Sequence, residues 1–193
     1  MLEYKIFFAL VASAFEIIAN FPYILDILAR KTTPHFFTWL IWTLLTWISF
    51  FILVSEGAGT GALVTGVTAV TCLGILTLSL FYGARKITTS DWICLILAFF
   101  ALALWKITNN GFLAIIIIVI VDTLGFIPTF RKSFLEPYKE TLSTYLLVTC
   151  KHLLTLFALQ MYTPTTILYP AILFLTNFLF VIMLIIRRKK IVV

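Results

Sequence analysis

The hydrophobic positions of this chain fall into seven long runs, separated by short breaks that hold charged residues, glycine or proline. A helix needs roughly 20 predominantly apolar residues to cross about 30 Å of hydrocarbon. Backbone groups in lipid must be hydrogen-bonded internally, which leaves helices and closed barrels, and the runs lack the short alternating segments of a barrel. The pattern predicts seven transmembrane helices, near residues 6–28, 36–54, 61–83, 91–107, 111–131, 141–160 and 165–186.

Composition leaves almost no residues for a soluble domain. Hydrophobic residues make up 62% of the chain and charged residues 11%, with a mean hydropathy of +1.12. Glu3 precedes the first run and Glu16 interrupts it, which argues against a cleaved signal peptide. We therefore expect an all-α, multi-pass integral membrane protein. Its short loops and the absence of targeting extensions favour a bacterial-type inner membrane.

The net charge of +6 follows a topological pattern. The breaks on one side read Ser55-Glu56-Gly57, Asn109-Asn110-Gly111 and Thr163-Pro164-Thr165, with Lys5 and Lys106 as their basic residues. By the positive-inside rule the N-terminus lies outside and the C-terminus in the cytoplasm. A nucleic-acid partner is not expected, because no soluble basic domain exists, whereas attraction to anionic lipid is. The other breaks hold most of the basic residues: Arg30, Lys31, Arg85, Lys86, Arg131, Lys132, Lys139, Arg187, Arg188, Lys189 and Lys190.

Two distant stretches carry the same acid-to-proline spacing. Glu16 precedes Pro22 by six residues, and Asp122 precedes Pro128 by six. Self-similarity at a fixed offset is the signature of a duplicated structural unit. The offset of 106 residues between the two motifs also aligns positions in the next two runs: Thr38-Trp39 with Thr144-Tyr145, and Thr71 with Asn177.

One offset across three consecutive runs predicts two parallel three-helix units joined by a linker helix. The units are residues 1–84 and 109–193, and residues 85–108 form the linker. A single linking span gives both units the same orientation. The linker run is almost wholly apolar from Ile93 to Trp105, as expected of a helix that faces lipid on several sides.

This 3+1+3 plan, with a proline-centred motif in the first helix of each unit, resembles the PQ-loop and SWEET transporter superfamily. The resemblance covers nearly the whole chain, although Pro22-Tyr23 and Pro128-Thr129 stand where that superfamily has Pro-Gln. Bacterial nicotinamide-riboside transporters share the plan, and Trp39-Leu-Ile-Trp42 resembles four residues of their tryptophan-rich segment. The resemblance implies a substrate cavity between the units, and a homodimer is left open.

Three ionisable residues, Glu16, Asp122 and Lys151, fall inside apolar runs. Each costs at least ~2.5 kcal/mol on insertion scales, and such residues mark substrate or ion pathways. The repeat places Glu16 and Asp122 at equal depth about a pseudo-two-fold axis, where both face one cavity. Two neighbouring carboxylates do not both ionise easily beside one lysine, so the trio is expected to hold an exchangeable proton. The alternative is a permanent pair with Lys151 that only orders the bundle.

Further candidates surround these three. In carriers of the SWEET type, the region matching Thr71 and Asn177 lines the substrate cavity, so the resemblance makes both substrate-binding candidates. His152 follows Lys151 and joins them, although a satisfied core histidine is the favoured interpretation. Pro22 and Pro128 each remove a helical hydrogen bond and are expected to act as hinges.

The sequence thus predicts a transporter of a small polar solute, such as a sugar, an amino acid or a vitamin-like molecule. It would work by alternating access, with proton coupling through Glu16 and Asp122. A receptor or sorting protein that binds without translocating is the alternative. A retinal protein would use a buried lysine, but the repeat has no role there. The chain is not expected to be an enzyme or to hold a metal or a cofactor. His152, the scattered serines and threonines and the three cysteines, whose spacing is not that of a pair, form no catalytic or ligating constellation.

Overall fold

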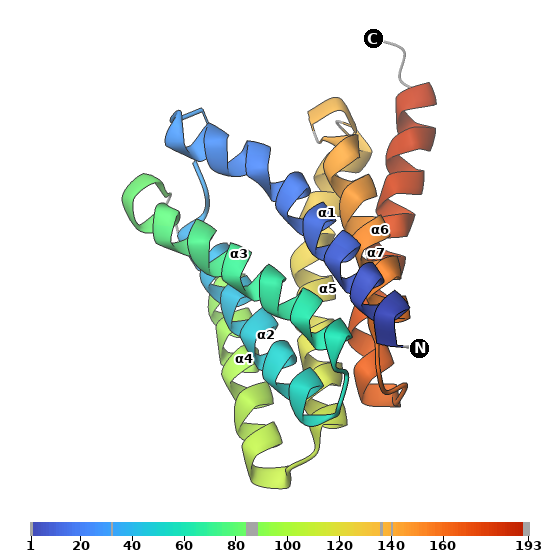
Figure 1. The fold of residues 1–193 in the computed structure, drawn as a ribbon. Coiled ribbons are helices and arrows are strands. Elements are labelled where there is room, and N and C mark those ends of the chain that lie inside the picture. Colours follow the sequence, from blue (N-terminus) through green and yellow to red (C-terminus); the bar gives the residue numbers. More distant parts are fainter. Residues whose placement is uncertain (1, 32, 84–88, 136, 140, 191–193) are drawn as a thin grey trace.

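The computed structural model describes residues 2–31, 33–83, 89–135, 137–139 and 141–190, and within the helices the side chains of residues 90, 91, 127, 128, 131, 132 and 139 are outside the description. Seven α-helices lie in these ranges (Figure 1). They are α1 Leu2–Leu28, α2 Phe36–Ser55, α3 Thr60–Tyr82, α4 Thr89–Thr108, α5 Gly111–Leu135, α6 Leu142–Ala158 and α7 Pro164–Lys190, with a 3-10 turn, η1, at Pro137–Lys139.

Each predicted run is a helix, which confirms the all-helical architecture. The helices α1, α2, α3 and α7 are long and apolar enough to cross a membrane, and α4, α5 and α6 contain shorter apolar stretches. This is the helix set of a multi-pass membrane protein. Several helices extend up to four residues beyond the predicted runs. The reason is that an apolar run stops at a charge such as Lys5 or Arg187, whereas backbone hydrogen bonding continues past it into the polar boundary.

The helix ends carry local signals that stop or start the backbone ladder. His35 precedes α2 and its ring nitrogen accepts from the amide of Thr38 at 3.4 Å. Thr163 accepts from the amide of Thr166 at 3.2 Å at the start of α7, which satisfies one of the amides that a helix leaves open. Between α2 and α3 the turn depends on Gly57 and Gly59, whose φ angles are +73° and +59°. Residues with a Cβ rarely adopt these angles.

The helices form two groups of three with the same order. In the first group α3 lies between α1 and α2, and in the second group α7 lies between α5 and α6. The groups join chiefly where α1 packs on α6, with further contacts of α2 on α5 and α3 on α6. The seventh helix, α4, packs against α5 and α2, so it lies at the side of the bundle (Figure 1).

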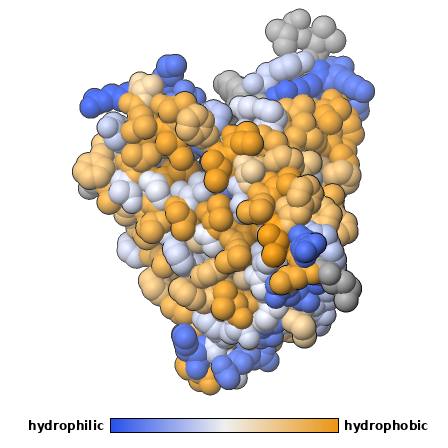
Figure 2. Space-filling model, in the orientation of Figure 1, coloured by the Kyte–Doolittle hydropathy of each residue, from blue (hydrophilic) through white to orange (hydrophobic). Residues whose placement is uncertain are grey.

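The surface of the bundle is largely apolar. Large hydrophobic side chains such as Phe7, Leu10 and Phe81 are more than half exposed, and Figure 2 shows hydrophobic residues over most of one face with hydrophilic residues toward its upper and lower ends. In a membrane such side chains face lipid, so exposure costs little. The interior instead uses small residues for close helix approach, as at Ala9 and Ala12, which cluster with Ala158 of α6.

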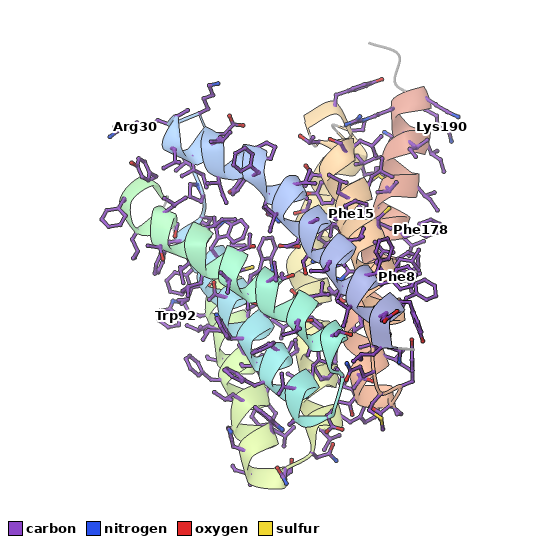
Figure 3. All side chains as sticks on the ribbon, in the orientation of Figure 1. Phe8, Phe15, Arg30, Trp92, Phe178 and Lys190 are labelled. Atoms are coloured by element: carbon purple, nitrogen blue, oxygen red, sulfur yellow. The ribbon has the colours of Figure 1, made fainter. Side chains whose placement is uncertain are left out.

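The two groups are joined by hydrogen bonds at the end of the bundle that holds Leu2. There the α2–α3 turn meets the α6–α7 loop: the backbone N–H of Gln160 donates to the Ala58 carbonyl at 2.9 Å. Thr60 Oγ1 donates to the Ala158 carbonyl at 2.6 Å. We call this contact the N-end latch. The other end of the bundle holds Arg30 and Lys190 (Figure 3).

Candidate functional site

A buried ion pair joins the two helix groups at mid-bundle. Lys151 Nζ, from α6, lies 2.7 Å from Glu16 Oε2, from α1, and both side chains are 4% exposed. Glu16 lies on the face of α1 that carries Ala9, Ala12 and Ala19, because the helical repeat brings positions three and four apart to one side. Two desolvated charges need a partner and further hydrogen bonds to be tolerated. The pair therefore fixes the rotation of α1 against α6.

Neighbouring side chains complete the hydrogen bonding of this pair. Asn20, one turn along α1, donates from Nδ2 to Glu16 Oε1 at 3.0 Å and to the Glu16 carbonyl at 2.9 Å. Lys151 Nζ also donates to Thr68 Oγ1 of α3 at 3.3 Å. An ammonium has three donors, and these contacts occupy two of them. The site thus spans α1, α3 and α6.

Asp122 lies close by but has a different partner. Its carboxylate, on α5, is within hydrogen-bonding reach of the Tyr169 hydroxyl on α7 and within electrostatic range of Lys151. Tyr169 is 4% exposed. Ser49 of α2 lies beside the same hydroxyl, and its own Oγ is buried without a well-formed hydrogen bond to any described residue. Asp122 is therefore held by a neutral donor, whereas Glu16 is held by a cation.

These side chains draw on both helix groups. We define the central cluster as Glu16, Asn20, Ser49, Thr68, Asp122, Lys151 and Tyr169. It takes residues from α1, α2, α3, α5, α6 and α7. Polar groups this deep in a membrane bundle are costly, and one helix pair would suffice for packing. The cluster therefore brings polar side chains of six helices together at the junction of the two groups.

A small cavity borders part of the cluster, although Glu16 and Asp122 are not among its walls. It has a volume of about 10 Å³, about enough for one water molecule. Its walls come from α3, α6 and α7 and include Lys151, Thr68 and Tyr169 together with His152 and Thr155. The space beside the cluster is therefore about the size of one water molecule.

The other residues predicted from the sequence to bind substrate differ in whether they line the cavity. His152 is 7% exposed and borders it, whereas Thr71 and Asn177 are not among its walls. Thr71 Oγ1 donates to the Val67 carbonyl at 3.0 Å, and Asn177 Nδ2 donates to the Leu173 carbonyl at 2.8 Å. Both are thus satisfied within their own helices. The side chain of Pro128 lies outside the described residues.

Pro22 separates two packing environments along α1. Before it, Ala12 belongs to a cluster with Val64 and Ala158, which ties α1 to α3 and α6. After it, Ile27 belongs to a cluster with Trp39 of α2 and Ile75 of α3, and all described residues of that cluster come from the first group. The part of α1 before Pro22 therefore contacts both helix groups, whereas the cluster after Pro22 contains α2 and α3 alone.

The central cluster contains residues that the sequence pattern did not single out. Tyr169 sits in an apolar run next to Pro170, and a tyrosine there signals an interface anchor more often than a buried donor. Asn20 lies four residues after Glu16, a spacing that places both on one helix face, so this signal was available in the sequence. Thr68 is one of several threonines on α3, and threonine is an ordinary helix-packing residue in membranes. Only its contact with Lys151 distinguishes it.

The charged groups of the central cluster determine which chemistry it supports. It contains two carboxylates and one ammonium. An uncompensated charge in a low-dielectric interior is expensive, so neutrality requires a proton on one carboxylate or a cationic group from outside. The Tyr169 hydroxyl can donate to an ionised Asp122 or accept from a protonated one. The arrangement is thus suited to taking up and releasing one positive charge.

Comparison with known proteins gives no further constraint: no protein family, curated protein or solved structure matches this chain.

Proposed function

We propose that this chain is a membrane transporter of a small polar solute that works by alternating access, with a proton exchanged at the Glu16–Lys151–Asp122 site. The observation that carries the proposal is the central cluster itself, in which Lys151 pairs with Glu16 while a second carboxylate, Asp122, lies within electrostatic range of the same lysine at the junction of two helix groups. A chain that only needed a rigid bundle would gain nothing from the second carboxylate. An unbalanced acid suits a site that changes its charge during a cycle.

The helix boundaries support an internal duplication. Shifted by the 106-residue offset between Glu16 and Asp122, the bounds of α1, α2 and α3 fall within three residues of those of α5, α6 and α7. The packing order is also the same, with the third helix of each group in the middle. We infer two parallel three-helix units with α4 as linker, all seven helices crossing the membrane. On this basis we propose that the chain is a divergent PQ-loop or SWEET-like transporter.

The state of the two ends supports alternating access. The N-end latch closes one end of the junction, whereas the surface at the other end is notched between the end of α1 and the second group (Figure 2). Under the positive-inside rule the closed end faces outward and the notched end faces the cytoplasm. The conformation then corresponds to a state that is latched at the outer end, with only a water-sized space beside the central cluster.

The test is uptake of a defined mixture of sugars, amino acids and B vitamins into proteoliposomes with an imposed pH gradient, read by mass spectrometry. Glu16→Gln and Asp122→Asn are each expected to lower gradient-driven uptake at least tenfold, because neither amide can exchange the proton. Asp26→Asn is the matched control, since Asp26 lies on α1 but outside the central cluster. It is expected to transport like the wild type.

The outcomes separate the competing functions. Loss in both cluster variants with a normal Asp26→Asn supports the proposal and identifies the solute. Normal, gradient-driven uptake in both cluster variants makes the carboxylates structural and overturns proton coupling. If folded wild-type protein takes up none of the solutes but binds one, the receptor or sorting function replaces the transporter.

A further inference from the structure

An apolar groove runs between α5 and α7, separate from the central cluster. It has a volume of about 710 Å³ and is lined by Thr123, Phe126, Phe130, Phe134, Leu135, Thr176 and Leu179. Phe134, Leu135 and Leu179 are between 48% and 66% exposed, so the groove opens to the surroundings of the bundle. The volume is in the range of ordinary ligand sites.

The two threonines of the groove do not make it polar. Thr123 Oγ1 donates to the Val119 carbonyl at 2.7 Å, and Thr176 Oγ1 donates to the Ile172 carbonyl at 2.8 Å. Each hydroxyl thus donates to its own helix, which leaves the described lining without a free hydroxyl donor for a sugar or an amino acid. The groove fits a hydrocarbon chain.

A cation stands at one end of the groove. The guanidinium of Arg187 lies 4.2 Å from the ring centroid of Phe134, and Arg187 Nε donates to the Phe134 carbonyl at 2.8 Å. A guanidinium has five N–H donors in a planar fork, and this bond uses one of them. Arg187 opens a run of four basic residues in the last turn of α7. Figure 3 shows that run ending at Lys190, at the same end as Arg30.

From this juxtaposition we propose that the α5–α7 groove is a binding site for an anionic phospholipid, with an acyl chain along Phe126, Phe130 and Leu179 and the phosphate on Arg187. The lining residues of α5 run along that helix from Thr123 to Leu135, and Arg187 lies beside Phe134 near the end of this row. The cation is thus placed as a lipid headgroup is relative to its chains. Basic residues at the cytoplasmic ends of transmembrane helices attract anionic headgroups. The proposal requires only that the bundle spans a membrane and does not depend on the transported solute.

The experiment is native mass spectrometry of the detergent-purified chain titrated with phosphatidylglycerol or, separately, with phosphatidylcholine. We expect phosphatidylglycerol to bind at least fivefold more tightly than phosphatidylcholine. Arg187→Gln is expected to weaken phosphatidylglycerol binding by roughly fivefold, the effect of one basic residue near a headgroup. Arg187→Lys keeps the charge and loses the Nε bond, so it is expected to retain most of the affinity and to separate charge from folding.

Two more variants locate the site. Leu179→Trp fills the groove and is expected to weaken the binding of both lipids, because it removes space for the acyl chain. Lys31→Gln makes the same change of charge as Arg187→Gln at the same end but on the exposed segment after α1, and is expected to bind lipid normally. Glycerol 3-phosphate, which has no acyl chain, is expected not to bind at lipid concentrations that saturate the site.

Several results would overturn the proposal. They are equal affinity for the two lipids, unchanged phosphatidylglycerol binding in Arg187→Gln, an equal loss in Lys31→Gln, and glycerol 3-phosphate binding as tight as that of the lipid. A dimer mass that Leu179→Trp abolishes would assign the groove to a second copy of the chain instead.

Discussion

Lys151 pairs with only one of the two acids in the central cluster. Its Nζ lies 2.7 Å from Glu16 Oε2, whereas it acts on the Asp122 carboxylate only through longer-range electrostatics. The residue 106 positions before Lys151 is Leu45, so the two acids related by that offset are accompanied by one lysine and not two. This inequality at single positions is what gives the central cluster a net charge to be neutralised.

Lys151→Met is expected to destabilise the bundle by about 3–5 kcal/mol, because it leaves the buried Glu16 carboxylate unpaired. The double variant Glu16→Gln with Lys151→Met removes both charges, while the amide oxygen introduced at position 16 can still accept from Asn20, and it is expected to recover most of that loss. Denaturant unfolding in mixed micelles measures both. A double variant as unstable as the single one would mean that the pair contributes more than charge compensation.

Tyr169→Phe is the second residue-scale prediction. The hydroxyl lies between Asp122 and Ser49, and its removal takes a donor from Asp122 without changing the size of the ring. We expect gradient-driven uptake to fall by on the order of tenfold, as for loss of a hydrogen bond of about 1.5 kcal/mol to a charged group, and to depend on external pH differently from the wild type. A pH profile identical to wild type would place Asp122 outside proton exchange.

At the scale of elements, α1 makes the main contact between the two helix groups. Its first part packs on α6 and its last part on α2 and α3, with Pro22 between them. Pro22 is exposed, so replacing it leaves no internal cavity. A proline inside a helix costs about 3 kcal/mol relative to alanine, and that cost is tolerated at this position.

Pro22→Ala is therefore expected to move stability and transport in opposite directions. The free energy of unfolding should rise, because the helix regains a backbone hydrogen bond, whereas the uptake rate should fall several-fold as the hinge stiffens. Denaturant unfolding and proteoliposome uptake measure the two quantities. A variant that is both more stable and fully active would show that α1 moves as a rigid rod.

The α2–α3 turn gives an element-scale prediction about the N-end latch. Gly59 has a φ of +59°, and a Cβ there would overlap the side chain of Gln160. Gly59→Ala should cost at least about 1 kcal/mol and open the latch, seen as a longer distance between spin labels at positions 55 and 162. Gly74→Ala is the control, because a Cβ at Gly74 meets nothing within 4 Å. An unchanged distance in Gly59→Ala would mean that the latch is not held by the turn.

For the whole molecule, the arrangement of the two ends predicts how the chain sits in the membrane. Arg30, Lys31 and the basic run of α7 share one end, and Asn110 lies at the other with the N-end latch. In a chain freed of its three cysteines, Asn110→Cys should react with a membrane-impermeant maleimide in intact cells. Lys190→Cys should react only after the membrane is opened. The reverse pattern would invert the topology and make the closed end cytoplasmic.

The sequence by itself determined the helices, their bounds within four residues and the residues of the buried charge, because apolar run length and ionisable interruptions are properties of the chain read in order. The spacing of Glu16 and Asp122 also predicted a shared site, and the order α1–α3–α2 and α5–α7–α6 agrees with that spacing.

Only the tertiary structure decided which acid Lys151 contacts and that Tyr169 and Ser49 lie beside the other acid. It also decided that one end of the bundle is latched and that Thr71 and Asn177 are not among the walls of the small cavity. The pair spans 135 positions of the chain. Such partners depend on how each helix is rotated and tilted against its neighbours. That rotation is set by packing between segments far apart in the sequence, which no local periodicity records.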